Sequence, residues 1–191
     1  MLLIKQKLSR DSVEFAQSEV SYQLVLPFEI RQKARFVAQL SLVGTQAKTD
    51  KEVGLQLERG KILRDGDKVV AENGDTIEIV AGDEAVSTVH CDDAKTLARV
   101  CYHLGNRHVP LQVEAGWCRF GQDHVLNEMV ELLGARVITE NAPFEPEAGA
   151  YAHSHSSHSH QTSQHGRHAA LSNDAKPSVN SINGIHRFET I

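Results

Sequence analysis

The sequence concentrates histidine in one stretch, where the side chains could bind a metal ion. Six of the 11 histidines lie between residues 153 and 168. Neutral imidazole binds zinc, copper, iron and nickel. In an extended chain, residues two apart point the same way, so neighbouring pairs can reach one ion. The candidate metal ligands of this stretch are His153, His155, His158, His160, His165 and His168.

The composition around these histidines predicts weak and exchangeable metal sites. Ser, His, Asn, Gln and Gly predominate from Tyr151 to Ile191, and such a segment buries too little apolar surface to offset the entropy of ordering. We therefore expect a disordered tail, with Glu145 and Glu147 in a solvated linker before it. Because divalent affinities rise through nickel to copper, the tail would also take Cu²⁺ or Zn²⁺ in vitro, and composition does not choose the metal.

A second candidate ligand, His108, lies in the run from Tyr102 to Pro110. This run follows a helical pattern, and Gly105 is expected to end that helix in a left-handed conformation. A lone histidine at such a place is more often a surface residue that interacts with the helix dipole than a metal ligand. One histidine is too few for a stable site, but a two-fold dimer would bring His108 from both chains to one point.

The N-terminal part of the chain is predicted to consist of β-strands. Asn73-Gly74 separates two short apolar runs and predicts a hairpin in which both central residues take positive φ. No helical period of comparable length competes, so residues 1–82 are expected to form a small antiparallel barrel or sandwich. The alternating apolar runs are Tyr22, Leu24, Leu26; Phe36, Ala38, Leu40, Leu42; and Val53, Leu55, Leu57.

Residues 83–144 carry a mixed pattern of four strands and two short helices. Asp92 or Asp93 and then Asp123 are candidate N-caps, and Gly134 is expected to end the second helix. The order β-α-β-β-α-β predicts a ferredoxin-like domain, and residues 145–191 complete the chain as the tail. The strands are expected at 86–91, 111–114, 117–120 and 135–139, with helix faces Leu97, Val100, Cys101, Leu104 and Val125, Leu126, Met129, Val130, Leu133.

The overall composition argues against nucleic-acid and membrane binding. The formal charge is −5, and the basic residues are scattered rather than clustered, so there is no electrostatic footprint for nucleic acid. The sequence has no run of 18 apolar residues, its first apolar stretch is too short for the h-region of a signal peptide, and the three cysteines have no CxxC spacing. We therefore expect a cytoplasmic protein with reduced thiols.

The sequence also lacks the motifs of common enzyme classes. It contains no HExxH, no P-loop and no GxSxG. Cys118 precedes His124 by six residues, but a cysteine within a strand is usually inert core. The densest set of ligands lies on the tail, whereas a metallohydrolase needs a fixed site with a positioned base. We therefore expect no catalytic activity.

Four stretches of the chain resemble one known family. The run from His103 to Gln112 is similar to the signature of the urease accessory proteins called UreE. The resemblance continues through the stretches 123–126 and 144–151, and includes the region Arg64–Asp67. It covers nearly the whole chain up to Tyr151, whereas the tail beyond Gln161 does not align in detail.

The resemblance implies a nickel chaperone of urease maturation. It implies a β-rich first domain, a ferredoxin-like metal-binding domain and a homodimer formed through the latter, with His108 of each chain as the interface nickel ligand. Some family members carry an H-x-H pair before the second helix, but Gln122 stands at the first of these positions here, so no site is assigned to His124. The implied acceptors are an accessory GTPase and the urease apoprotein.

Two other functions remain compatible with these residues. The protein could be a passive nickel store, in which the tail buffers metal and no transfer occurs. Alternatively, the first domain could bind urease subunits as an assembly module, with metal binding incidental. Storage requires the tail, delivery requires His108, and an assembly role requires neither, so these hypotheses make different predictions.

Overall fold

The protein is represented by a computed structural model that describes residues 1–45 and 47–148. The six histidines of the predicted tail lie outside these residues. None of the helices in the described part of the chain is long and apolar enough to cross a membrane.

The first part of the chain forms a closed six-stranded barrel, as predicted. The strands pair in the order β1-β4-β3-β2-β6-β5, and β1 pairs with β5 to close the barrel. Two of its strand pairs differ from the antiparallel pairing expected, because β1 with β4 and β2 with β6 are parallel. The strands are β1 (Leu2–Lys7), β2 (Val20–Leu26), β3 (Arg35–Ser41), β4 (Lys48–Gln56), β5 (Lys68–Ala71) and β6 (Thr76–Ala81).

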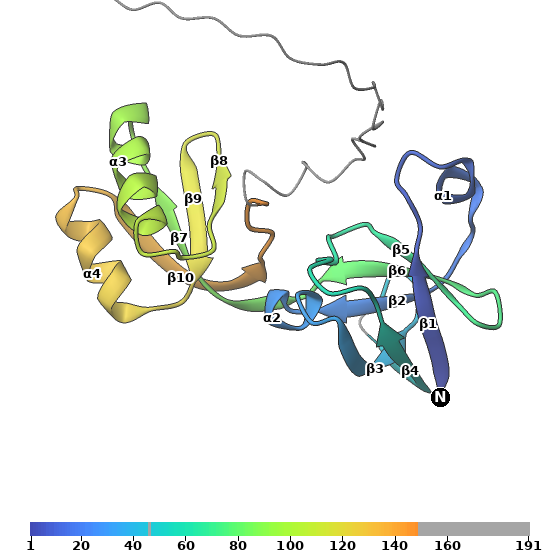
Figure 1. Cartoon of the computed structure of the whole chain (residues 1–191). Helices are drawn as coiled ribbons and strands as arrows, with labels where there is room; N and C mark the ends of the chain where they lie inside the picture. The colour runs from blue at the N-terminus through green and yellow to red at the C-terminus, as the bar shows by residue number, and fades with distance from the viewer. Residues whose placement is uncertain (46, 149–191) are drawn as a thin grey trace, which may run out of the picture. The chain divides into compact units, whose positions relative to one another are not determined.

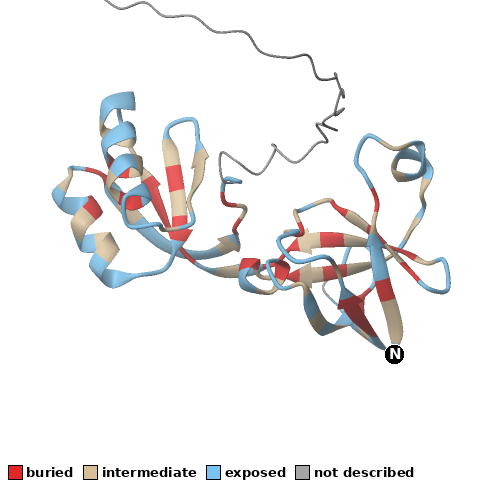
Figure 2. Ribbon diagram, viewed as in Figure 1, coloured by how far each residue is buried: buried red, intermediate tan, exposed pale blue. Residues whose placement is uncertain are grey.

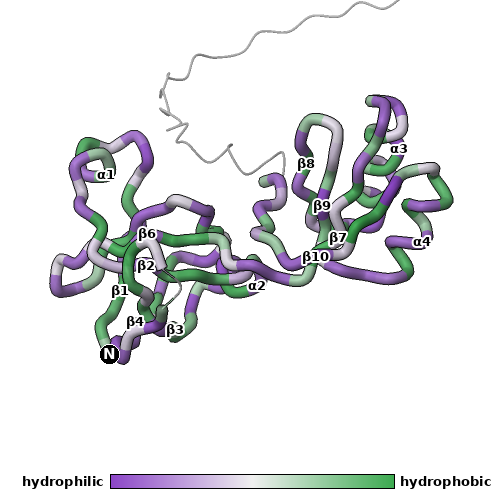
Figure 3. The backbone as a smooth tube through the Cα atoms, turned by 180° about the vertical axis from the view of Figure 1, so that it is seen from behind, coloured by the Kyte–Doolittle hydropathy of each residue, from purple (hydrophilic) through white to green (hydrophobic). Residues whose placement is uncertain are grey.

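Alternation along these strands fills the barrel with aliphatic side chains. Hydrophobic stretches follow β2 and β6 in Figure 3, and their inward residues are fully buried. Leu42, predicted to continue the run of β3, lies beyond its end and is half exposed. The buried core of the barrel consists of Ile4, Leu24, Leu26, Leu40, Val53, Leu55, Leu63, Val69, Ala71, Ile77 and Ile79.

Two short helices in this region were not expected from the sequence. The helix α1 (Val13–Gln17) is capped by Ser12, whose hydroxyl accepts from the Phe15 N–H at 3.1 Å. The helix α2 (Phe28–Arg31) begins after Pro27 and has four residues. Helices this short do not contain enough residues to show a helical period of apolar side chains, so the apolar pattern of the sequence did not predict them.

The hairpin between β5 and β6 is confirmed, but its turn differs from the prediction. The Ala71 N–H donates to the Asp75 carbonyl at 3.0 Å, so residues 72–74 form a three-residue loop. Only Gly74 has a positive φ, of 90°. A three-residue loop requires one left-handed residue at its end, which is why Asn73 does not need to adopt that conformation.

The second part of the chain has the predicted ferredoxin-like order. Its sheet is antiparallel with strand order β10-β7-β9-β8, and both helices lie on the same face (Figure 1). The buried core between sheet and helices includes Val89, Val100, Leu104, Phe120 and Val130. The elements are β7 (Asp83–His90), α3 (Ala94–Gly105), β8 (Gln112–Glu114), β9 (Trp117–Gly121), α4 (His124–Leu132) and β10 (Arg136–Pro143).

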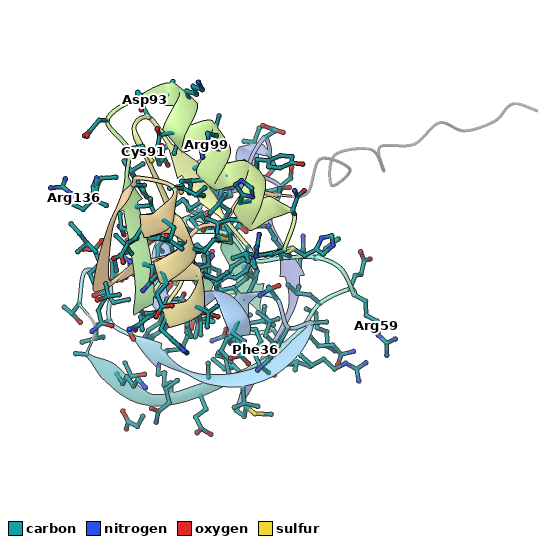
Figure 4. The ribbon with its side chains drawn as sticks, turned by 90° about the vertical axis from the view of Figure 1, so that its left-hand side faces the viewer. Phe36, Arg59, Cys91, Asp93, Arg99 and Arg136 are labelled. Carbon is teal, nitrogen blue, oxygen red and sulfur yellow. The ribbon has the colours of Figure 1, made fainter. Side chains whose placement is uncertain are left out.

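Both helices begin at the predicted aspartates. The Asp93 carboxylate accepts from the N–H groups of Lys95 and Thr96, and lies at the start of α3 (Figure 4). Asp123 caps α4 in the same way. Val125, in the first turn of α4, is the exception on the predicted apolar face: it is 60% exposed.

Candidate metal-binding site

The helix α3 ends in a Schellman motif, in which two backbone N–H groups bond back across the last turn. The Val109 N–H donates to the Leu104 carbonyl at 3.4 Å, and the His108 N–H donates to the Gly105 carbonyl at 2.9 Å. The motif needs a left-handed residue, and His108 fills that position with φ of 56°. The predicted left-handed stop at Gly105 is therefore wrong: Gly105 is the last residue of α3, and the reversal falls three residues later.

The other helix of this domain ends in the same motif with a glycine in the equivalent place. The Ala135 N–H donates to the Val130 carbonyl at 3.4 Å, and the Gly134 N–H donates to the Glu131 carbonyl at 2.9 Å. Gly134 has φ of 90°, which costs glycine little. The two helix ends therefore differ in one respect: where α4 has glycine, α3 has histidine.

The presence of histidine rather than glycine at this left-handed position makes His108 a functional candidate on geometric grounds. Among the described residues, His108 is the one non-glycine residue with a positive φ. A left-handed conformation costs such a residue about 1–2 kcal/mol, and backbone strain of this kind is concentrated at functional sites. His108 is exposed and stands where glycine would be easier to accommodate, which makes its imidazole a candidate for a function.

The surroundings of His108 suit a cation. The residue follows the C-terminal end of α3, where the helix dipole is negative and favours positive charge. Arg107 already donates through Nη1 to the His103 carbonyl at 2.9 Å, which satisfies one of the last carbonyls of the helix. His108 is exposed, Tyr102 in the last turn of α3 is 64% exposed, and the outward surfaces of α3 and α4 are mostly exposed (Figure 2). His108 is thus accessible to an ion and to a second chain.

One chain does not complete a metal site within the described residues. No three His, Cys, Asp or Glu side chains are grouped closely enough in residues 1–45 and 47–148 to hold an ion. His124 is exposed at the start of α4, and no such group forms around it. A metal on His108 therefore needs further ligands from a second chain or from residues beyond 148, which include all six tail candidates.

The three cysteines lie in or against the core of the second domain. Burial raises the pKa of the Cys118 thiol well above its ordinary range, and it also raises the pKa values of Cys91 and Cys101. Cys118 is completely buried in the domain core. Cys118 therefore belongs to the packing, as expected for this strand cysteine, and Cys91 and Cys101 pack against the same core.

The sequence did not predict the group of residues that forms hydrogen bonds with Glu145. The interpretation of Glu145 as part of a solvated linker is wrong. Its carboxylate accepts hydrogen bonds from Arg31 Nη1 at 2.8 Å, from Arg64 Nη1 at 2.7 Å and from the Asp65 N–H at 2.7 Å. Arg31 belongs to the unexpected helix α2, so no pattern in the sequence indicated that it would be close to a residue 114 positions away.

Comparison with known proteins places this chain in a family. The family model for the UreE urease accessory protein, N-terminal domain, matches residues 4–82, and that for the C-terminal domain matches residues 84–169. A urease accessory protein UreE of Alkalilimnicola ehrlichii is 55% identical over 128 residues, which are 67% of this chain and 74% of that protein. This chain belongs to the UreE family.

Other UreE proteins are similar over comparable lengths. That of Proteus mirabilis is 50% identical over 128 residues, covering 67% of this chain and 75% of the relative. That of Tolumonas auensis is 45% identical over 152 residues, covering 79% and 76%. The resemblance found in the sequence is thereby confirmed. The UreE family is a family of non-catalytic chaperones that deliver nickel during urease maturation.

Proposed function

We propose that this UreE protein carries Ni²⁺ on His108 of two chains and passes it to the urease apoprotein through an accessory GTPase. The observation that supports His108 is its left-handed position at the end of α3, where the equivalent residue of α4 is glycine. In this proposal the homodimer forms through the second domain, so one imidazole from each chain reaches the same ion.

Two imidazoles leave the nickel ion with open coordination positions. Water and the tail histidines His153, His155, His158 and His160, with His165 and His168 further along, would fill these positions. A ligand from the acceptor protein can then bind the nickel ion before His108 dissociates from it, so the ion is transferred by stepwise ligand exchange. The negative end of the α3 dipole favours the charge of the ion, and the same imidazole tract would bind Cu²⁺ or Zn²⁺ in vitro.

We further propose a division of labour along the chain. Residues 1–82 would contact the urease assembly partners, residues 83–144 would hold the transferable ion, and residues 145–191 would capture metal. The tail raises the local concentration of ligands at His108, on the order of millimolar for a short flexible linker. With the tail alone, the protein would only store nickel, whereas a tail combined with a transfer site would allow it to deliver nickel.

Activation of apo-urease by the purified accessory proteins tests this function. His108→Ala should abolish nickel-dependent activation while the tail still binds nickel, and a protein ending at Tyr151 should keep partial activity. His124→Ala is the matched control, since it also removes an exposed histidine at a helix end of the same domain. Full activation by His108→Ala would refute the proposal and would favour an assembly role.

A further inference from the structure

The sheet of the second domain ends in a long edge strand. β10 is outermost in the order β10-β7-β9-β8, and among the described residues it pairs with β7 alone. Its register with β7 continues through all eight residues from Arg136 to Pro143 without a bulge. On its other side, β10 therefore presents a row of backbone N–H and C=O groups to which another strand can bind. The opposite edge strand, β8, has only three residues.

β10 has few of the features that usually keep two edge strands apart. Bulges, prolines and charged side chains are the common ones. Pro143 is the last residue of β10 and does not interrupt it. The strand carries two charged residues, but Arg136 and Glu140 have opposite signs and lie two residues on either side of Ile138. Opposite charges placed symmetrically about one residue attract a second, antiparallel copy of the same strand rather than repel it.

Arg136, Ile138 and Glu140 share the face of the sheet that the helices leave uncovered. Side chains alternate along a strand, and Val137 packs against the core between sheet and helices, so its neighbours face the other way. Ile138 is 43% exposed, and the Arg136 side chain extends away from the ribbon into solvent (Figure 4). The three side chains thus form an exposed row along the free edge.

Both charged side chains of this row have capacity for a further partner. Arg136 forms no ion pair within residues 1–45 and 47–148. Glu140 accepts through Oε1 from Thr88 Oγ1 at 2.6 Å and from Arg119 Nη2 at 3.1 Å, and its Oε2 accepts no hydrogen bond within the same residues. The hydrogen bond from Thr88 holds the pKa of Glu140 below its ordinary value. Glu140 is therefore charged at neutral pH and held in place, with one oxygen free.

We propose that the β10 edge is a self-association surface, at which β10 of a second copy of this chain pairs antiparallel in a register centred on Ile138. Each Arg136 then lies directly opposite Glu140 of the other copy, and the two Ile138 side chains meet on the two-fold axis. The two four-stranded sheets join into one sheet of eight strands. A register centred on Val137 or Thr139 would separate the opposite charges, so the charges select this one.

This surface differs from the one proposed to hold nickel. His108 lies four residues before β8, the strand at the other edge of the sheet. The inference therefore does not rest on the proposed function, and two chains joined at His108 would still have two free β10 edges. A single strand pair is smaller than the roughly 1,000 Å² of a stable interface. We therefore expect reversible, concentration-dependent association.

A cysteine at Ile138 tests the register. In Ile138→Cys, two thiols lie directly opposite each other with Cα atoms about 4.5–5.5 Å apart, which suits a disulfide. Oxidised glutathione should therefore link full-length chains in EDTA, where no metal bridges them. Thr139→Cys is the matched control, because Thr139 is exposed on the same strand but lies opposite Val137 of the second copy in this register. Equal rates of linkage in the two variants would overturn the inference.

Charge reversal tests the complementarity. Arg136→Glu places like charges opposite each other at two symmetric positions, so sedimentation equilibrium of the metal-free full chain should show association weakened about four-fold or more. Combining Arg136→Glu with Glu140→Arg restores opposite charges and should recover the association. Arg59→Glu is the matched control, since it reverses an exposed arginine of the barrel (Figure 4). Association that is equal in Arg136→Glu and Arg59→Glu would contradict the proposal, as would a natural chain whose mass stays constant up to about millimolar concentration.

Hydrogen exchange distinguishes a second copy from other occupants of the edge. The β10 amides that do not bond to β7 should gain protection as the protein concentration rises. Protection at every concentration would mean that a segment of the same chain covers the edge, and protection only with added urease apoprotein would mean that a partner's strand does; either result excludes self-association. His108→Ala should leave the association through β10 unchanged, so this inference and the nickel site can fail separately.

Discussion

Replacing His108 by glycine should stabilise the metal-free protein relative to His108→Ala, although both remove the imidazole. His108 is left-handed with φ of 56°, and alanine would inherit that conformation. The conformation costs a non-glycine residue about 1–2 kcal/mol. Glycine avoids this cost but gains freedom in the unfolded chain, which returns about 0.4–1 kcal/mol. The net advantage of His108→Gly over His108→Ala is therefore about 0.8 kcal/mol.

Urea unfolding of the two variants at one protein concentration measures this difference, which corresponds to about 2–3 °C in Tm for a chain of this size. A fixed concentration is needed because dimerisation contributes to apparent stability. Gly134→Ala is the reciprocal control: it occupies the same place in α4, and an added Cβ would meet nothing within 4 Å. It should destabilise the protein by a similar amount for the same conformational reason.

Both His108 variants should lose the nickel site of the protein ending at Tyr151. The natural histidine would then be a residue kept for function at a cost in stability. If His108→Gly were no more stable than His108→Ala while Gly134→Ala lost stability as expected, the left-handed strain at His108 would be refuted. The geometric argument for its function would then fail with it.

Three further predictions concern the caps, the cysteines and the metal. Asp93→Ala should lower the free energy of unfolding by about 1 kcal/mol in urea unfolding, because two N–H groups at the start of α3 lose their acceptor; Asp92→Ala should change it little. Burial raises the pKa of Cys118 in the folded state, so its contribution to stability is present below the unfolded thiol value of about 8.5 and is lost as pH rises above it. Urea unfolding at increasing alkaline pH should show this loss, and Cys118→Ala should reduce the dependence. Nickel affinity measured by calorimetry should fall as pH drops through about 6.5, where ordinary imidazole takes up a proton; a flat profile would exclude imidazole ligation.

The sequence predicted those parts of the fold that depend on local pattern. Alternation identified the barrel strands, and Asp93 and Asp123 marked both helix starts because an N-cap acts within three residues. The end of α3 was misplaced because Gly105 is a common signal for a left-handed stop, whereas the chain continues to His108 before it reverses. The strain at His108 has no signature in the amino-acid sequence, since it is visible only as a dihedral angle.

The ion pair between Arg31 and Glu145 could not be predicted for a different reason. Arg31 and Glu145 are 114 positions apart, and their pairing follows from the packing of α2 and Phe144 rather than from any local preference. In the sequence, Arg31 stands in a run with Glu29 and Lys33 that resembles an ordinary solvated surface. A buried ion pair between distant segments requires the tertiary structure to be known.

Calorimetric titration of Ni²⁺ into the protein ending at Tyr151, with and without His108→Ala, tests the central claim most directly. The account predicts a tight site that takes one ion per two chains and disappears in His108→Ala, because each chain provides one imidazole to a shared ion. If the shortened protein binds no nickel, while the full chain binds it equally with or without His108, the site at the end of α3 does not exist. The protein would then be a store of nickel on its tail rather than a carrier.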